Sequence, residues 1–116
     1  MSLKVLNTNN YFIASEEESF NRIVTTPLGS RVVRPFFGSK IHELVDRTMD
    51  EEWKMLFQKY LFECFYDENH KPWDKRLVPK STKILSVDAT FGVVKCSITF
   101  ENKEVEINMG GFTKWL

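Results

Sequence analysis

The sequence predicts an α+β fold in which three helices pack on a C-terminal antiparallel β-meander. Apolar residues recur at helical spacing between about residues 16 and 66, whereas they alternate with polar residues from about residue 82 onward. A polar break at residues 67–72 separates the two patterns. Helices followed by strands are typical of the α+β class, and 116 residues are the length of a single domain.

The composition indicates a packed domain without a strong overall charge. The chain is 42% apolar and holds ten Phe, three Trp and three Tyr, which is enough side-chain volume for a core. Sixteen basic residues balance sixteen acidic ones, so no global field attracts nucleic acid or an anionic membrane. No apolar run is long enough to span a bilayer, and residues 1–10 lack the apolar region of a secretory signal. We therefore expect assembly in the cytoplasm, with Cys64 and Cys96 as buried thiols.

The first helix is predicted at about residues 16–25, after a weakly patterned stretch over residues 1–14 in which residues 7–10 are expected to form a turn or loose segment. Ser15 and Glu18 have the spacing of a capping box at its start. Apolar residues then recur at helical spacing: Phe20, Ile23 and Val24.

The loop that follows is unusually constrained. It contains two pairs of helix-breaking residues: Pro27 with Gly29, and Pro35 with Gly38. Glycine permits backbone angles that other residues resist, and proline fixes its own φ. Residues 31–34 are therefore expected to form a short extended piece between two specified turns.

Two further helices are predicted at about residues 40–46 and 49–66. Ser39 is the expected cap of the first, and Thr48 with Glu51 has capping-box spacing for the second. The residues expected to face the core are Ile41, Leu44 and Val45 in the shorter helix, and Met49, Trp53, Leu56, Phe57, Tyr60, Leu61 and Cys64 in the longer one.

A second apolar stripe lies on nearly the opposite side of the longest helix, formed by Met55, Phe62 and Tyr66. A helix that is apolar on two sides is either sandwiched inside the fold or covered by a partner. Two interpretations follow: the N-terminal segment covers the stripe, or the stripe is a docking surface.

Three strands are predicted at about residues 82–89, 93–100 and 103–108, with reversals near Gly92 and residues 101–103. Short connections require antiparallel pairing. The residues expected to face inward are Leu85, Val87, Ala89, Val94, Cys96, Ile98, Phe100, Val105 and Ile107. The outer face is expected to pair Lys95, Ser97 and Thr99 with Glu104 and Glu106.

No motif indicates catalysis, a metal or a cofactor. Carboxylates are plentiful, but the sequence identifies no pair held at the separation that a glycosidase needs. His42 and His70 lie far apart without ligands at metal-binding spacing, and the cysteines have no histidine partner at a nucleophile spacing. No glycine-rich phosphate loop is present.

Three arginines in turn-bounded segments have two interpretations: Arg31, Arg34 and Arg76. A guanidinium presents a planar fork of donors that suits carbonyls and carboxylates. The arginines either cap helix ends within the domain or fasten a neighbouring subunit, where arginine and aromatic anchors are enriched.

Residues 23–39 read IVTTPLGSRVVRPFFGS. This segment closely resembles the signature of the phage tail-baseplate wedge family, whose members are also called sheath initiators or, in some cases, tail lysozymes. The family also includes the baseplate component of type VI secretion systems. Its second signature is a Glu-Pro-Arg tripeptide after an aromatic residue. Here the matching segment begins at Trp73, where Asp74 and Lys75 replace Glu and Pro and Arg76 is retained.

The resemblance implies a non-enzymatic structural protein of a contractile-tail baseplate, assembled in the host cytoplasm and present in the virion tail. It implies docking on wedge proteins through Trp73, Asp74, Arg76, Arg31 and Arg34, and a structural loop motif formed by Pro27, Gly29, Pro35, Phe37 and Gly38. The sheet would template the first ring of the sheath protein by strand addition. The isolated protein would be a monomer that joins a sixfold baseplate, with no cofactor, nucleic acid or membrane.

Two competing functions come with the resemblance. One is a peptidoglycan hydrolase, suggested by the lysozyme name of some members. The other is a regulatory anti-adaptor that binds a proteolysis adaptor, because a bacterial protein of that kind has the same fold.

Overall fold

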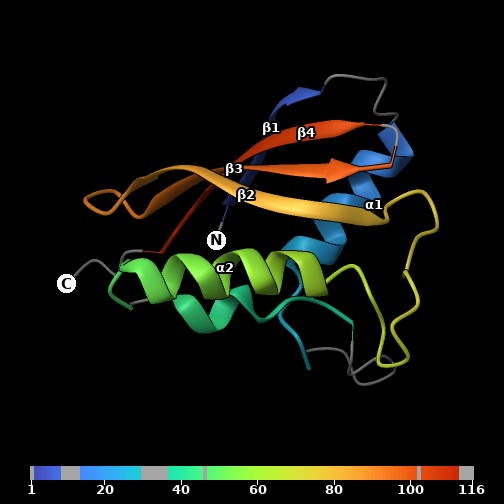
Figure 1. Cartoon of the computed structure of the whole chain (residues 1–116), viewed down its shortest axis with the longest axis horizontal. Coiled ribbons are helices and arrows are strands. Elements are labelled where there is room, and N and C mark those ends of the chain that lie inside the picture. Colours follow the sequence, from blue (N-terminus) through green and yellow to red (C-terminus); the bar gives the residue numbers. More distant parts are fainter. Residues whose placement is uncertain (1, 9–13, 30–36, 46, 102, 113–116) are drawn as a thin grey trace.

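A four-stranded antiparallel sheet and two α-helices make up most of the described part of the chain (Figure 1). The computed structural model describes residues 2–8, 14–29, 37–45, 47–101 and 103–112. Its elements in chain order are β1 (Ser2–Thr8), α1 (Ala14–Thr25), the 3₁₀ helix η1 (Lys40–Leu44), α2 (Glu51–Glu63), β2 (Pro79–Asp88), β3 (Val93–Phe100) and β4 (Glu104–Gly110). The predicted α+β class and its C-terminal antiparallel meander are confirmed.

The sheet has one strand more than the sequence pattern indicated. Its strand order is β1-β4-β3-β2, and β1 pairs antiparallel with β4 from Ser2 opposite Gly110 to Thr8 opposite Val105. The prediction of a turn or loose segment at residues 7–10 is therefore wrong for Asn7 and Thr8, while residues 9 and 10 lie outside the described residues, and the weak pattern of residues 1–14 did not reveal the strand. The pattern there is short and interrupted, because the register shifts between Val5 and Asn7 and breaks the alternation on which the prediction relies.

Helix α1 begins earlier than predicted and is not capped by Ser15. It starts at Ala14, so Ser15 lies inside its first turn. Glu18 does not reach back to the helix start, because its carboxylate accepts a hydrogen bond from Arg22 one turn later at 3.2 Å. The predicted capping box is therefore wrong, whereas the predicted core residues of this helix, Phe20, Ile23 and Val24, are all buried.

The other two helices are shorter than predicted. The segment at 40–46 is a 3₁₀ helix that ends at Leu44. Helix α2 spans Glu51–Glu63 rather than 49–66, and Asp50 is its N-cap, accepting a hydrogen bond from the Trp53 backbone N–H at 2.9 Å. The capping box predicted from Thr48 is wrong because the acidic cap two residues later satisfies the first turn.

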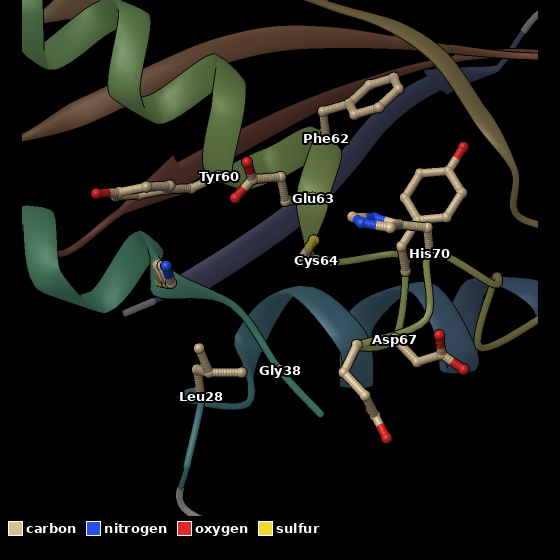
Figure 2. A pocket seen from close by; sticks show the side chains of 11 residues that line it. Leu28, Gly38, Tyr60, Phe62, Glu63, Cys64, Asp67 and His70 are labelled. Atoms are coloured by element: carbon tan, nitrogen blue, oxygen red, sulfur yellow. The ribbon is translucent and has the colours of Figure 1, made fainter. Parts of the chain in front are cut away.

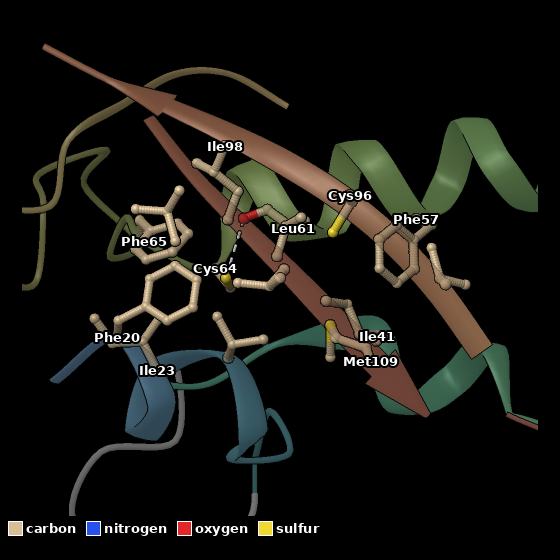
Figure 3. Packing of buried hydrophobic residues seen from close by; sticks show 14 of the residues in the cluster. Phe20, Ile23, Ile41, Phe57, Leu61, Cys64, Phe65, Cys96, Ile98 and Met109 are labelled. Carbon is tan, nitrogen blue, oxygen red and sulfur yellow. Dashed lines mark hydrogen bonds between the residues drawn. The ribbon is translucent and has the colours of Figure 1, made fainter. Parts of the chain in front are cut away.

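The core lies between one face of the sheet and the helices (Figure 3). Phe20 of α1 contacts Phe65 and Phe100, with ring centroids 5.6 and 6.3 Å away. Cys64 and Cys96 are buried free thiols, as predicted. Burial raises the pKa of the Cys96 thiol to about 12, and raises the pKa of the Cys64 thiol as well.

The inward residues predicted for β3 and β4 are buried, but two of the three predicted for β2 are not. Leu85 is 42% exposed, and Ala89 is exposed beyond the end of β2. A register shift between Ile84 and Ser86 leaves Leu85 out of the pairing, so that Ile84 packs against the core in its place, whereas Val87 packs there as predicted.

The outer face of the sheet follows the predicted pairing in part. Ser97 lies opposite Glu106, and Thr99 lies opposite Glu104. Lys95 lies opposite Asn108 rather than an acid. The Ser97 hydroxyl donates to the Glu104 carboxylate across the diagonal at 3.1 Å. The side-chain contact here is therefore a hydrogen bond and not the predicted charge pair.

The second apolar stripe of α2 is not covered by the N-terminal segment. Met55 is 69% exposed, and residues 2–8 lie beside β4 instead. Phe62 and Tyr66 are half-buried and contact each other, with ring centroids 5.6 Å apart. The interpretation in which the N-terminal segment sandwiches this stripe is therefore wrong for residues 2–8, and residues 9–13 lie outside the described residues.

Candidate functional site

The two ends of the signature loop meet in a short parallel bridge between Pro27 and Ser39. The Ser39 N–H donates to Thr26 O at 2.9 Å, and the Leu28 N–H donates to Ser39 O at 3.1 Å. The Ser39 hydroxyl adds a bond to Val24 O at 2.9 Å. We call this set of contacts the loop clamp. Ser39 is a clamp residue rather than a side-chain cap, since its hydroxyl makes no capping bond to η1.

The clamp requires glycine at one position. Gly38 has φ = 116°, and a Cβ built there would lie 2.4 Å from Thr26 O. Gly29 also has a positive φ, 84°, but a Cβ there would meet nothing within 4 Å. Both glycines were predicted as loop-forming, and the structure separates their roles: Gly29 supplies only a backbone angle, whereas Gly38 supplies an angle and a close approach.

His42 adds a polar contact at the same place. Its Nε2–H donates to Thr25 O at 3.0 Å, which joins η1 to the end of α1. Burial lowers the pKa of His42, which favours its neutral form. Arg31, Arg34 and Pro35 lie outside the described residues, so their proposed roles stay predictions.

The structure brings the two signature segments together. The Phe37 ring, at the end of the loop, meets the Trp73 ring edge-on with centroids 5.2 Å apart. The Trp73 backbone N–H donates to Phe65 O at 3.0 Å, while its buried indole N–H has no hydrogen-bond partner among the described residues. Sequence spacing alone gave no reason to expect this contact.

Asp74 and Arg76 form a bidentate pair within the turn. Arg76 donates to both carboxylate oxygens of Asp74 at 3.0 and 2.8 Å, and its Nη1 donates to the Ser15 hydroxyl at 2.8 Å. The hydrogen bonds from Arg76 lower the pKa of Asp74 to about 2. Arg76 thus ties the turn to the first turn of α1, while 46% of its side chain stays exposed.

A second contact fastens the same end of α1. Glu16 is 6% exposed, and its carboxylate is paired with the Lys103 ammonium in the turn between β3 and β4. We call this ion pair, together with the Ser15–Arg76–Asp74 contacts, the α1 joint. No local pattern indicated this ion pair, because Glu16 and Lys103 lie 87 positions apart in the sequence.

Beside the clamp lies an open groove with a volume of about 670 Å³ (Figure 2). Leu28 and Gly38 form one side of it, and the last turn of α2 with the following turn forms the other. The lining residues are Leu28, Gly38, Lys40, Tyr60, Phe62, Glu63, Cys64, Tyr66, Asp67, Glu68 and His70. Of these lining residues, only Phe62 and Tyr66 belong to the stripe that the sequence offered as a docking surface. The others were missed because the groove is assembled from two segments that lie far apart in the sequence.

Within the described part of the chain, no group of three or more His, Cys, Asp or Glu side chains is arranged to hold a metal ion. None of the helices described is both long and apolar enough to cross a membrane. No known protein-family model matches the chain, and a search of curated proteins gives no significant match.

Proposed function

We propose that this protein is a structural component of a contractile-tail baseplate, which docks on wedge proteins and templates assembly of the sheath. The observation that carries the proposal is the signature segment, residues 23–39, together with the clamp that closes its base. Its glycines and Ser39 serve one local geometry, in which Gly38 admits no side chain. A loop base specified this closely is suited to holding the two ends of the loop in place for a partner.

The contact between Phe37 and Trp73 supports a shared docking surface. It places the loop end beside the turn that matches the second family signature. Arg76 is held by Asp74 and Ser15, so its exposed portion is pre-organised rather than free to rotate. Pre-organisation lowers the entropy cost of binding a wedge subunit.

Strand addition to the sheath requires an unpaired sheet edge, and the two edges differ. The border of β2 is partly guarded, because Tyr66 donates to Pro79 O at 3.3 Å and the Gln58 side chain accepts from the Ile84 N–H at 3.0 Å. The outer edge of β1 has no strand beside it among the described residues. We therefore assign sheath contact to the β1 edge, where main-chain hydrogen bonds can form with little demand on side chains.

Co-purification with the products of neighbouring tail genes tests the proposal. Tagged wild-type protein should retain both a wedge and a sheath protein, and Arg76→Ala should lose the wedge protein selectively. Lys75→Ala is the matched control, because Lys75 is exposed in the same turn. Unchanged wedge capture by a folded Arg76→Ala protein would remove this turn from the interface.

If the protein turned over purified peptidoglycan and Glu63→Gln abolished that turnover, the structural function would be rejected in favour of a peptidoglycan hydrolase. Glu63 is the variant to use because it lies in the groove.

A further inference from the structure

The groove between Gly38 and the end of α2 is lined by aromatic rings and by carboxylates (Figure 2). Tyr60, Phe62 and Tyr66 supply the rings. Three carboxylates line the groove, from Glu63, Asp67 and Glu68, against the single ammonium of Lys40. This combination favours cationic ligands, since aromatic faces and carboxylates both attract cations.

The three carboxylates of the groove differ in how many hydrogen bonds they accept from the described residues. Asp67 accepts hydrogen bonds from the Asn69 and Lys71 N–H groups at 2.8 and 2.9 Å, so it shapes its own turn. Glu63 and Glu68 are exposed, and in the described parts of the chain no hydrogen bond or ion pair engages either carboxylate. As far as the described residues go, two carboxylates therefore remain available to an incoming ligand.

The position of Glu63 is unfavourable for the isolated domain. It is the last residue of α2, and the last turn of this helix carries no basic residue. The carboxyl end of a helix bears partial negative charge, which repels an acid there. A cation bound beside Glu63 would relieve this repulsion.

The groove already holds one cation against an aromatic face. The Lys40 ammonium lies 5.9 Å from the centroid of the Tyr60 ring. Phe62 and Tyr66 add two further rings, whose centroids are 5.6 Å apart and whose planes are tilted by 36°. A second cation therefore has both a ring surface and free carboxylates within one cavity.

We propose that this groove binds an arginine-bearing apolar segment of a partner protein. A guanidinium can lie flat on an aromatic ring while it forks to a carboxylate, which an ammonium does less well. Leucine-like side chains fill the apolar remainder between Leu28 and the α2 rings. The inference goes beyond the baseplate proposal and does not depend on it.

A labelled peptide in which arginine alternates with leucine is the direct probe, measured by fluorescence anisotropy. The matched peptide carries citrulline, which keeps the shape of arginine without its charge. We expect the citrulline peptide to bind about tenfold more weakly, and binding of the arginine peptide to weaken with salt. Equal binding of both peptides would overturn the proposal in favour of a merely apolar groove.

Two sets of variants locate the contact. Glu63→Gln combined with Glu68→Gln should weaken arginine-peptide binding about tenfold, whereas Glu52→Gln at the other end of α2 should leave it unchanged. Tyr66→Phe and Tyr66→Leu both lose the hydroxyl bond to Pro79, but only Leu loses the ring. Tyr66→Leu should therefore bind a few-fold more weakly than Tyr66→Phe.

Other occupants give distinct results, each of which overturns the proposal. Binding that is absent in the wild type but gained after Arg31→Ala with Arg34→Ala would show that this chain's own arginines fill the groove. Concentration-dependent self-association that Glu63→Gln with Glu68→Gln abolishes would show that a second copy fills it. An absence of peptide binding in the wild type and all variants would exclude an arginine site.

Discussion

The two long helices differ in how their ends are held. Helix α1 is tied at both ends by polar contacts to distant parts of the chain, through the α1 joint at its start and the loop clamp at its end. Helix α2 is capped at its start by Asp50, but its last turn opens into a groove where the Glu63 carboxylate has no hydrogen-bond or ion-pair partner among the described residues.

The difference shows which charged side chains stabilise the folded domain. A buried carboxylate is costly unless it is paired, and Glu16 is both buried and paired with Lys103. An exposed carboxylate at a helix C-terminus gives the fold nothing and slightly opposes the helix dipole. We therefore expect changes around α1 to lower stability, and changes at the end of α2 to alter recognition instead.

The largest expected effect comes from the clamp. Gly38→Ala should lower the free energy of unfolding by about 3 kcal/mol or more, because a backbone clash adds to left-handed strain. Gly29→Ala is the matched control, and its strain alone should cost about 1–2 kcal/mol. Urea unfolding of both variants measures the difference. Equal losses would show that the close approach to Thr26 O is not what demands glycine.

The ion pair of the joint comes next. Glu16→Gln should cost about 2–3 kcal/mol, because it leaves the Lys103 ammonium nearly buried beside a neutral amide. Glu17→Gln, on the exposed side of the same turn, should change stability by less than about 0.5 kcal/mol. A double-mutant cycle with Lys103→Met gives the coupling energy. A coupling near zero would mean that the joint does not fasten α1.

A smaller, pH-dependent effect is expected at Asp74. Its folded-state pKa of about 2 is below the ordinary 3.8, so the unfolded chain binds more protons between these values. The stabilisation is complete above about pH 5 and declines as the pH falls toward 2. Asp74→Asn should flatten this part of the stability profile, as followed by thermal unfolding across pH. An unchanged acid limb would assign the loss to other groups.

Local patterns predicted the elements of this fold better than they predicted its long-range contacts. The buried positions of α2, such as Trp53 and Phe57, follow from helical spacing alone. Strand β1 escaped prediction because its pairing with β4 joins the two ends of the described chain. The exposure of Leu85 was not predicted, because a register shift between Ile84 and Ser86 interrupts the alternation of inward and outward residues.

The site was predictable only where one segment determines it. Pro27, Gly29 and Gly38 indicated a constrained loop, and the clamp closes that loop at its base. The partner of Trp73 and the groove depend on segments that are remote in sequence. No local spacing signals such contacts. Glu63 at the end of α2 was a usable signal, because the partial negative charge of a helix C-terminus disfavours an acid there and no described residue pairs with its carboxylate.

The smallest expected effect has the opposite sign, and it distinguishes the two helices most sharply. Glu63→Gln should raise the free energy of unfolding by about 0.3–1 kcal/mol, because it removes an acid from the negative end of α2. Glu16→Gln, the same chemical change at the start of α1, should destabilise. If Glu63→Gln destabilises the domain instead, Glu63 serves the fold, and the acids of the groove are structural rather than a recognition surface.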